Sequence, residues 1–356
     1  MSKFKYFPII KTRDAELRCF ENIRGDVFDK ILPIYELTKS RKCLKAPDGD
    51  IFRRMQQIKK IQNGRPFILD LTTDEKYINP QIKQLLSEQD GFWNWRHFFN
   101  ESHRDLNIIP MVHIYEDDDR GFEDVIKFVR DVSSYKNNLA VRLPYDLDED
   151  EIVYYLEPIV SNLSEDCKLY VFLDAGYIRK DAKESLSDVS KTFLRSARAV
   201  NGFARKIDDL VILSTSFPSS PATEGGHDSD GSFIIYEESI YHAVKKELNN
   251  IKYGDYASIN TEQIEMKGGT FVPRIDIALK DGNTFIYKRY RRNEGSYIRC
   301  AKEVLTDPRY MNYHGWSDEE ILSASEDNPS GISPAYWISV RMHYYITTRV
   351  ILRSFY

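Results

Sequence analysis

Short apolar segments alternate with segments of helical periodicity along most of this chain, and this alternation constrains the fold more than any other feature. Seven such pairs follow one another, from an apolar segment at Tyr6–Ile10 to one at Leu210–Leu213. The helical segments place apolar residues three or four positions apart, as at Phe20, Ile23 and Val27. Consecutive strand–helix units in this order predict a parallel sheet with right-handed crossovers.

The apolar segments contain few polar residues, which is typical of strands that are buried on both faces. With an eighth strand expected at Tyr253–Ser258, the pattern fits a closed (β/α)8 barrel of the TIM type better than an open sheet. No Gly-x-Gly-x-x-Gly follows the first strand, which argues against an open dinucleotide-binding sheet. We therefore predict an α/β fold in which residues 1–356 form one barrel domain.

The alternation becomes irregular in the C-terminal third of the chain. Ser219–Ser232 is rich in Ser, Gly, Asp and Pro, and this composition predicts a mobile loop. Arg274–Leu279 and Thr284–Arg289 flank a turn and predict an added β-hairpin. We interpret 219–300 as a loop and hairpin elaboration of the barrel, although the sequence leaves open a separate lobe. A C-terminal helix over 333–354, with a Ser-Pro start, is expected to close the barrel.

Overall charge and composition exclude several classes of protein. Lysine and arginine number 50 against 55 aspartates and glutamates, so the net charge of −5 excludes a general basic coat for nucleic acid. The four cysteines form no Cys-x-x-Cys pair, which argues against a thiolate zinc site and a disulfide framework. We find no signal peptide and no apolar run long enough to span a bilayer. We expect a cytoplasmic protein without a membrane partner.

Charged and hydroxyl side chains follow several of the expected strands. In a parallel barrel the loops at the carboxyl ends of the strands form the functional face. This rule selects a ligand-binding set of Lys11, Arg13, Glu36, Arg41, Arg142, Ser214 and Ser216. Guanidinium groups bind phosphate bidentately, so these residues predict a site for a phosphate-bearing ligand. The alternative is that the same charges form structural ion pairs with one another.

Three acidic residues and one histidine at strand ends suggest a different chemistry. Glu36, Asp70 and Asp174 are candidate ligands for a divalent metal, Mg2+ or Mn2+, which prefers oxygen. His113 is a candidate general base, and Asp70 and Asp174 are the other catalytic candidates. Ion pairs with the arginines, and a hydrogen-bonded structural histidine, are the competing interpretations.

The second strand of the expected hairpin ends in a basic tract that is a candidate nucleic-acid surface. It consists of Lys288, Arg289, Tyr290, Arg291 and Arg292. Alternating aromatic and cationic side chains can stack on bases and contact phosphates. The alternative is an exposed edge strand that charge protects from aggregation.

Three early segments, YFPIIKTRDAELRCFENI, ILPIYELTKSR and FILDLTT, resemble the beta-protein family named from the T-even bacteriophages, whose members occur in phages, prophages and bacteria. The resemblance covers essentially the whole chain, including the terminal WISVRMHYYI. The matching positions are Lys11, Arg13, Glu16, Glu36, Arg41 and Asp70. The resemblance implies a barrel-like domain and a setting in phage–host conflict. It brings no established reaction or catalytic residues.

Three functions remain open from the sequence. The first is a protein of antiphage defence or counter-defence that binds a phosphate-bearing ligand or nucleic acid, together with a co-encoded partner protein. The second is a metal-dependent phosphodiesterase or related hydrolase that uses the strand-end carboxylates. The third is a non-catalytic protein-interaction module. For the first function we expect Arg13→Ala to abolish the ligand response with little change in melting temperature.

Overall fold

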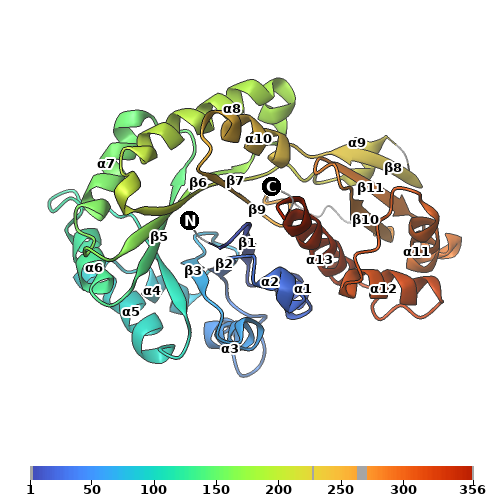
Figure 1. The fold of residues 1–356 in the computed structure, drawn as a ribbon. Coiled ribbons are helices and arrows are strands. Elements are labelled where there is room, and N and C mark those ends of the chain that lie inside the picture. The colour runs from blue at the N-terminus through green and yellow to red at the C-terminus, as the bar shows by residue number, and fades with distance from the viewer. Residues whose placement is uncertain (1–2, 227, 263–270, 355–356) are drawn as a thin grey trace.

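A closed barrel of eight parallel strands forms one side of the molecule in the computed structural model, which describes residues 3–226, 228–262 and 271–354 (Figure 1). Neighbouring strands pair in parallel around the whole barrel. The predicted TIM-type barrel is therefore confirmed. Its strands are β1 (Phe7–Lys11), β2 (Ile34–Leu37), β3 (Phe67–Leu71), β4 (Ile108–Val112), β5 (Asn138–Pro144), β6 (Lys168–Tyr177), β7 (Ile207–Thr215) and β9 (Ile251–Asp255).

Helices connect these strands and cover the outside of the barrel (Figure 1). Side chains alternate across each strand, so the barrel has two apolar layers. Phe7 and Ile9 of β1 belong to the cluster inside the barrel, whereas Ile10 belongs to the cluster between the strands and the helices. The helices are α1 (Asp14–Glu21), α2 (Gly25–Phe28), α3 (Ile51–Gln62), α4 (Pro80–Leu85), α5 (Gln89–His97), α6 (Glu123–Ser133), α7 (Glu149–Val160), α8 (Arg179–Asn201) and α10 (Glu237–Glu247).

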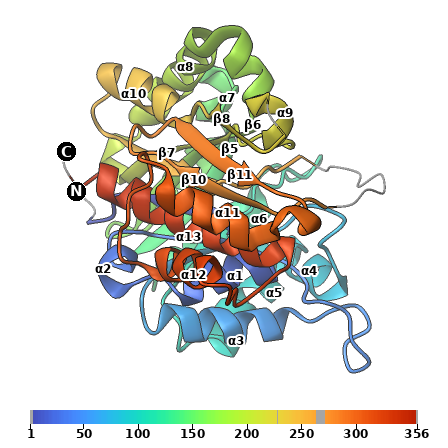
Figure 2. The same ribbon diagram turned by 90° about the vertical axis from the view of Figure 1, so that its right-hand side faces the viewer.

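A second, smaller sheet stands beside the barrel with an apolar core of its own (Figures 1 and 2). Its antiparallel strands lie in the order β10, β11, β8. We call this sheet and its helices the C-terminal sheet unit. It contains α9 (Pro221–Gly225), β8 (Asp230–Ile234), β10 (Arg274–Ala278), β11 (Thr284–Arg289), α11 (Ser296–Thr306), α12 (Trp316–Ser325) and α13 (Pro334–Leu352).

The structure changes two expectations for the C-terminal third. The β10–β11 hairpin is present, but part of the expected loop at 219–232 forms α9 and the start of β8. β8 escaped prediction because its sequence, DGSFI, is rich in small and polar residues. Because β8 pairs with β11, the basic tract begins on a central strand, and the edge-strand interpretation is wrong. The segment 219–300 is divided between the two parts of the fold. Its α10 and β9 complete the barrel, whereas its remaining strands form the second sheet.

Helix α13 holds the C-terminal sheet unit against the barrel. It begins as predicted, with the Ser333 side chain accepting a hydrogen bond from the Tyr336 amide and Pro334 in the first turn. It packs on α1 of the barrel and on β10 and α12 of the sheet unit. Tyr345 of α13 also donates a hydrogen bond of 2.6 Å to Asp255 of β9. Within the described residues, α13 and the other helices are too short or too polar to cross a membrane.

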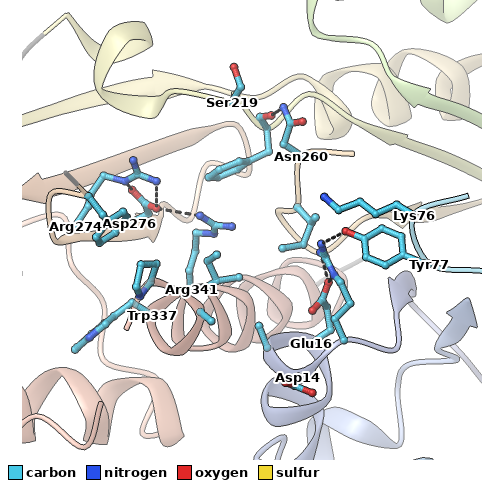
Figure 3. Close-up of a pocket in the computed structure, with 18 of the residues that line it drawn as sticks. Asp14, Glu16, Lys76, Tyr77, Ser219, Asn260, Arg274, Asp276, Trp337 and Arg341 are labelled. Atoms are coloured by element: carbon cyan, nitrogen blue, oxygen red, sulfur yellow. Dashed lines mark hydrogen bonds and ion pairs between the residues drawn. The ribbon is translucent and has the colours of Figure 1, made fainter. Parts of the chain in front are cut away.

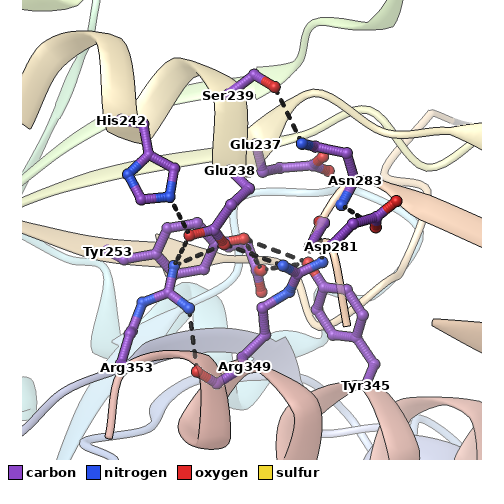
Figure 4. A network of polar contacts seen from close by, with 12 residues as sticks. Glu237, Glu238, Ser239, His242, Tyr253, Asp281, Asn283, Tyr345, Arg349 and Arg353 are labelled. Atoms are coloured by element: carbon purple, nitrogen blue, oxygen red, sulfur yellow. Dashed lines mark hydrogen bonds and ion pairs between the residues drawn. The ribbon is translucent and has the colours of Figure 1, made fainter. Parts of the chain in front are cut away.

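A buried charge network reinforces this attachment (Figure 4). Glu238 of α10 accepts hydrogen bonds from Arg349 at 2.9 Å and from Arg353 at 2.8 Å, both near the end of α13. Arg349 also donates to the carbonyl of Gly282, in the turn between β10 and β11, at 2.6 Å. One carboxylate of the barrel helices therefore fixes α13 and the hairpin together.

Candidate functional site

The mouth of the barrel holds charged residues from five strands or strand ends, with Arg142 of β5 at their centre. Its guanidinium lies 2.8 Å from Asp70, 3.0 Å from Asp174 and 3.6 Å from Glu36. Lys11 Nζ lies 2.5 Å from the other oxygen of Glu36. We call Lys11, Glu36, Asp70, Arg142 and Asp174 the barrel-mouth cluster. The structure thus brings together predicted residues from β1, β2, β3, β5 and β6.

The environment of the cluster shifts the pKa values of two of its carboxylates in opposite directions. Burial opposes ionisation of Glu36, but Arg142 and Lys11 hold the pKa of Glu36 below its usual value. Burial raises the pKa of Asp70 to about 6, and the neighbouring charges of Glu36 and Asp174 act in the same direction against Arg142. Of Glu36 and Asp70, Asp70 is therefore the one that takes up a proton first as the pH falls.

The barrel-mouth carboxylates do not fit a divalent metal. Glu36, Asp70 and Asp174 all direct oxygens at Arg142, so the position in which they converge holds a guanidinium. A cation placed there would be repelled by a group that keeps its charge at any physiological pH. In the described ranges, no three His, Cys, Asp or Glu side chains are arranged to hold a metal ion. The alternative interpretation, in which these carboxylates form ion pairs with an arginine, agrees with the observed distances.

His113 lies at the end of β4, close to the cluster but packed among aromatic rings. Its ring centroid lies 6.1 Å from that of Phe92 and 5.7 Å from that of Trp95. Burial, assisted by the charge of Arg142, lowers the pKa of His113 to about 4. Its Nε2 has no hydrogen-bond partner among the described residues. The imidazole is therefore neutral near pH 7 and a weak base.

The two predicted serines lie apart from the charged residues. Ser216 Oγ donates to Glu237 at 2.7 Å and accepts from the Tyr236 amide at 2.7 Å, which fixes the start of α10. Ser214 is buried at the end of β7, in register with Asp255 of β9. Ser216 is thus built into the joint between the barrel and α10, and Ser214 belongs to the pairing of β7 with β9.

A cavity of about 640 Å³ between the barrel and the C-terminal sheet unit is a candidate binding site (Figure 3). Among the described residues, eight lysines and arginines line it, against three carboxylates. In Figure 3, Lys76 and Tyr77 of the barrel lie across the cavity from Arg274 and Asp276 of the sheet unit. We call these two sides the barrel wall and the sheet wall.

The barrel wall carries most of the positive charge. Its cations follow β1, β2 and β3, and they are Arg13, Lys39, Arg41, Lys42, Arg54 and Lys76. The ring of Tyr77 lies 5.5 Å from Lys76 Nζ and 5.7 Å from the Arg13 guanidinium carbon. Arg13 is ion-paired with Glu16. Lys76 is exposed and has no carboxylate within ion-pair distance in the described part of the chain.

The sheet wall is mainly aromatic and apolar, with one compact group of charges. Its rings are Phe217, Phe271, Tyr297 and Trp337. Its charges belong to Arg274, Asp276 and Arg341. Figure 3 shows Asp276 between the two arginines. The cavity therefore combines a cationic wall with an aromatic one.

The predicted ligand-binding residues thus divide between two neighbouring places. Arg13 and Arg41 line the cavity, whereas Lys11, Glu36 and Arg142 belong to the barrel-mouth cluster. Tyr77 connects the two, because Lys11 Nζ lies 5.1 Å from its ring. Lys76 and Tyr77 were missed although they follow β3, where the strand-end rule applies. For the charges of the sheet wall, the one signal in the sequence is Arg341, an arginine among the apolar residues of the C-terminal helix.

The basic tract of β11 is largely occupied by ion pairs. Lys288 is buried, with Nζ 3.2 Å from Asp307, and Arg289 is ion-paired with Asp228. Arg291 lies 2.7 Å from the same Asp228. Tyr290 is buried beneath the Arg299 guanidinium, and Arg292 remains exposed. These pairs reduce the charge that the tract offers to a polyanion.

Comparison with known proteins assigns nearly the whole chain to one protein family. The family model described as Beta protein matches residues 6–351, from the start of the barrel into α13. Protein beta of Enterobacteria phage P4 is 30% identical over 353 residues, which cover 98% of this chain and 94% of that protein. No solved structure matches the chain.

Proposed function

This chain belongs to the Beta protein family, in agreement with its resemblance and its phage association, and from this premise we propose that it binds a phosphate-bearing ligand in the cavity between barrel and sheet unit. The ligand is a nucleotide or the end of a nucleic-acid strand. The observation that carries the proposal is the excess of cations in the cavity, eight against three carboxylates in the part of the chain that the structure describes. The chain as a whole has a net charge of −5, so positive charge is concentrated at this place.

The size and the lining of the cavity support a ligand of this class. A volume of about 640 Å³ lies within the range of small-molecule and cofactor sites. The barrel wall supplies lysines and arginines, which suit phosphate oxygens. The sheet wall supplies aromatic rings, which suit a base. Metal-dependent hydrolysis receives no comparable support, because the barrel-mouth carboxylates are paired with Arg142.

Calorimetric titration of the full chain with adenosine 5′-monophosphate and with adenosine tests this proposal. Lys76 is the residue to change, because it lines the cavity and no carboxylate depends on it. We expect the monophosphate to bind, adenosine to bind more weakly, and Lys76→Gln to reduce the affinity for the monophosphate by about tenfold. Lys83→Gln, at an exposed position of α4 outside the cavity, is the matched control. Equal affinity for both compounds in all variants would contradict the proposal.

Arg13 is a poorer choice for this test than the sequence predicts. It is the ion-pair partner of Glu16, whose side chain is almost fully buried. Burial raises the pKa of Glu16 even with Arg13 beside it. Removing the guanidinium would leave this carboxyl group buried without its partner, so we now expect Arg13→Ala to lower the melting temperature as well.

We also propose that the binding serves phage–host conflict, in defence or counter-defence, together with a co-encoded partner protein. The relative in phage P4 supports this setting. Plating efficiency of a phage panel on cells that express the chain tests it. We expect the wild-type chain to change plating for at least one phage and Lys76→Gln to lose that effect. Unchanged plating with both chains would contradict the role in phage–host conflict and would leave the binding proposal standing.

A further inference from the structure

One carboxylate on the sheet wall organises two arginines that face the cavity. Asp276 of β10 accepts hydrogen bonds from Arg274 Nε at 2.6 Å and from Arg341 Nη1 at 3.2 Å. Asp276 is only 5% exposed and Arg341 only 7% exposed. All three residues line the cavity (Figure 3). We call them the arginine triad.

Further contacts hold Arg341 in one orientation. Its guanidinium donates to the hydroxyl of Ser258 at 3.3 Å and to the carbonyl of Ser258 at 3.1 Å. The guanidinium carbon lies 4.1 Å from the centre of the Phe217 ring, which supports it from one side. A side chain fixed in this way loses little further freedom when it binds a ligand.

The triad is short of negative charge. Two guanidinium groups share a single carboxylate, so the group carries a net positive charge where water is largely excluded. Burial lowers the pKa of Arg341, which means that its environment lacks part of the negative charge that would balance it. An anion in the cavity would supply that charge and accept hydrogen bonds from both arginines.

Arg274 and Asp276 of the triad lie across the cavity from Lys76 of the barrel wall (Figure 3). On the barrel wall, Arg13 is ion-paired with Glu16 and Arg41 with Asp14, whereas Lys76 has no such pair among the described residues. The lining of the cavity also includes Ile259 and Ile338. Such a lining favours an aromatic or apolar group and disfavours a third charge. The cavity therefore presents cations on two facing walls and has apolar side chains in the same lining.

We propose that the natural ligand carries two phosphate groups separated by a nucleoside, one on the barrel wall and one on the arginine triad. This inference rests on the proposed function and narrows its ligand class. A 5′-phosphorylated dinucleotide and the 5′-phosphorylated end of a single strand share this chemistry. A nucleoside monophosphate has only one of the two groups and would leave one subsite unused.

Calorimetric titration of the full chain with adenosine 5′-monophosphate, adenosine 3′,5′-bisphosphate and a short single-stranded oligoadenylate tests the inference. We expect the bisphosphate to bind on the order of 100-fold more tightly than the monophosphate, because the second phosphate binds from within the same complex. A further gain for the oligoadenylate would identify a strand as the ligand. Equal affinity of the bisphosphate and the oligoadenylate would identify a small molecule. Both results support two subsites.

Arg274→Gln separates the triad from the rest of the cavity. Arg274 can be removed while Asp276 keeps Arg341 as its partner, so the fold is expected to persist. We expect Arg274→Gln to remove most of the advantage of the bisphosphate over the monophosphate. Arg274→Lys, which keeps the charge without the planar fork, should retain part of it. Lys280→Gln, at an exposed position in the turn between β10 and β11 of the same unit, is the matched control.

The outcomes distinguish this inference from the proposed function. If the monophosphate and the bisphosphate bind equally well and Arg274→Gln changes neither affinity, the triad is no subsite, while phosphate binding in the cavity stands. If neither compound binds and the oligoadenylate also fails to bind, the proposed function itself is contradicted. A loss of the bisphosphate advantage in Lys280→Gln as well would also overturn the role of the triad.

Discussion

Arg142 is the residue on which the charge balance of the barrel mouth depends. Glu36, Asp70 and Asp174 each come within 3.6 Å of its guanidinium, and its side chain is 23% exposed. Three carboxylates in such a place repel one another strongly, because water screens them poorly. These acids can pack together at the mouth of the barrel because the positive charge of Arg142 lies between them. The same residue that neutralises the cluster also excludes a metal from it.

We predict that Arg142→Gln lowers the free energy of unfolding by about 3 kcal/mol at pH 7, because it leaves buried carboxylates without their counter-charge. Urea unfolding at equilibrium measures the loss. The deficit should shrink as the pH falls and the acids become protonated. Arg198→Gln, at an exposed position of α8, is the control and should change stability by less than about 0.5 kcal/mol. A deficit independent of pH would show that packing, and not charge, explains it.

Asp70 gives a second prediction, on pH dependence. Burial raises the pKa of Asp70 to about 6, above its usual value of 3.8. The folded chain therefore binds this proton between those two pH values while the unfolded chain has released it, so this group lowers stability as the pH rises through that window. Relative to Asp70→Asn, the wild type should lose about 2–3 kcal/mol between pH 4 and pH 7. A constant difference between the two chains over that range would contradict the raised pKa.

At the scale of the elements, Glu238 connects three parts of the fold. Two arginines of α13 converge on this residue of α10, and one of them continues to the turn between β10 and β11. Arg349 is only 1% exposed, and Glu238 is its ion-pair partner at 2.9 Å. The two arginines and His242 hold the pKa of Glu238 at about 2 in spite of its burial. This network fixes the sheet wall relative to the barrel wall.

We predict that Glu238→Gln loosens α13 before it loosens the barrel. The variant leaves two buried guanidinium groups without a carboxylate and should cost about 3 kcal/mol. Hydrogen–deuterium exchange read by mass spectrometry should show faster exchange in α13 and unchanged exchange in β5. Glu247→Gln, at an exposed position of the same α10, is the control. Unchanged protection of α13 in Glu238→Gln would show that apolar packing alone holds the helix.

Local patterns predict some of these elements well and others poorly. The barrel strands and the hairpin were predictable because each is a continuous apolar or alternating segment. β8 was not, because Gly231 is required by the Tyr287 ring of β11: a Cβ at Gly231 would lie 2.6 Å from its hydroxyl oxygen. The residue that makes this strand fit is thus one that a strand pattern disfavours. Its role becomes visible only when the two strands are paired.

At the scale of the whole molecule, the same limit applies to the candidate site. The strand-end rule predicted Lys11, Glu36, Asp70 and Arg142 as neighbours, because a closed barrel brings all carboxyl ends to one face. It could not predict the cavity, since Arg274 and Arg341 meet only after β10 has packed on α13. The charged group of the sheet wall therefore comes from tertiary contacts that have no period in the sequence.

The segregation of charge in the molecule leads to a final prediction on salt dependence. A chain with a net charge of −5 should repel a nucleic-acid strand except at its basic cavity, so only the two phosphates on its walls contribute released counterions. For a single-stranded oligoadenylate, the logarithm of the association constant should fall with the logarithm of salt concentration with a slope of about −1.4. Fluorescence anisotropy measures this slope. Lys76→Gln should make it shallower by about 0.7, and Lys83→Gln should leave it unchanged. A slope of about −4 or steeper, insensitive to Lys76→Gln, would indicate an extended surface outside the cavity and contradict binding between the two walls.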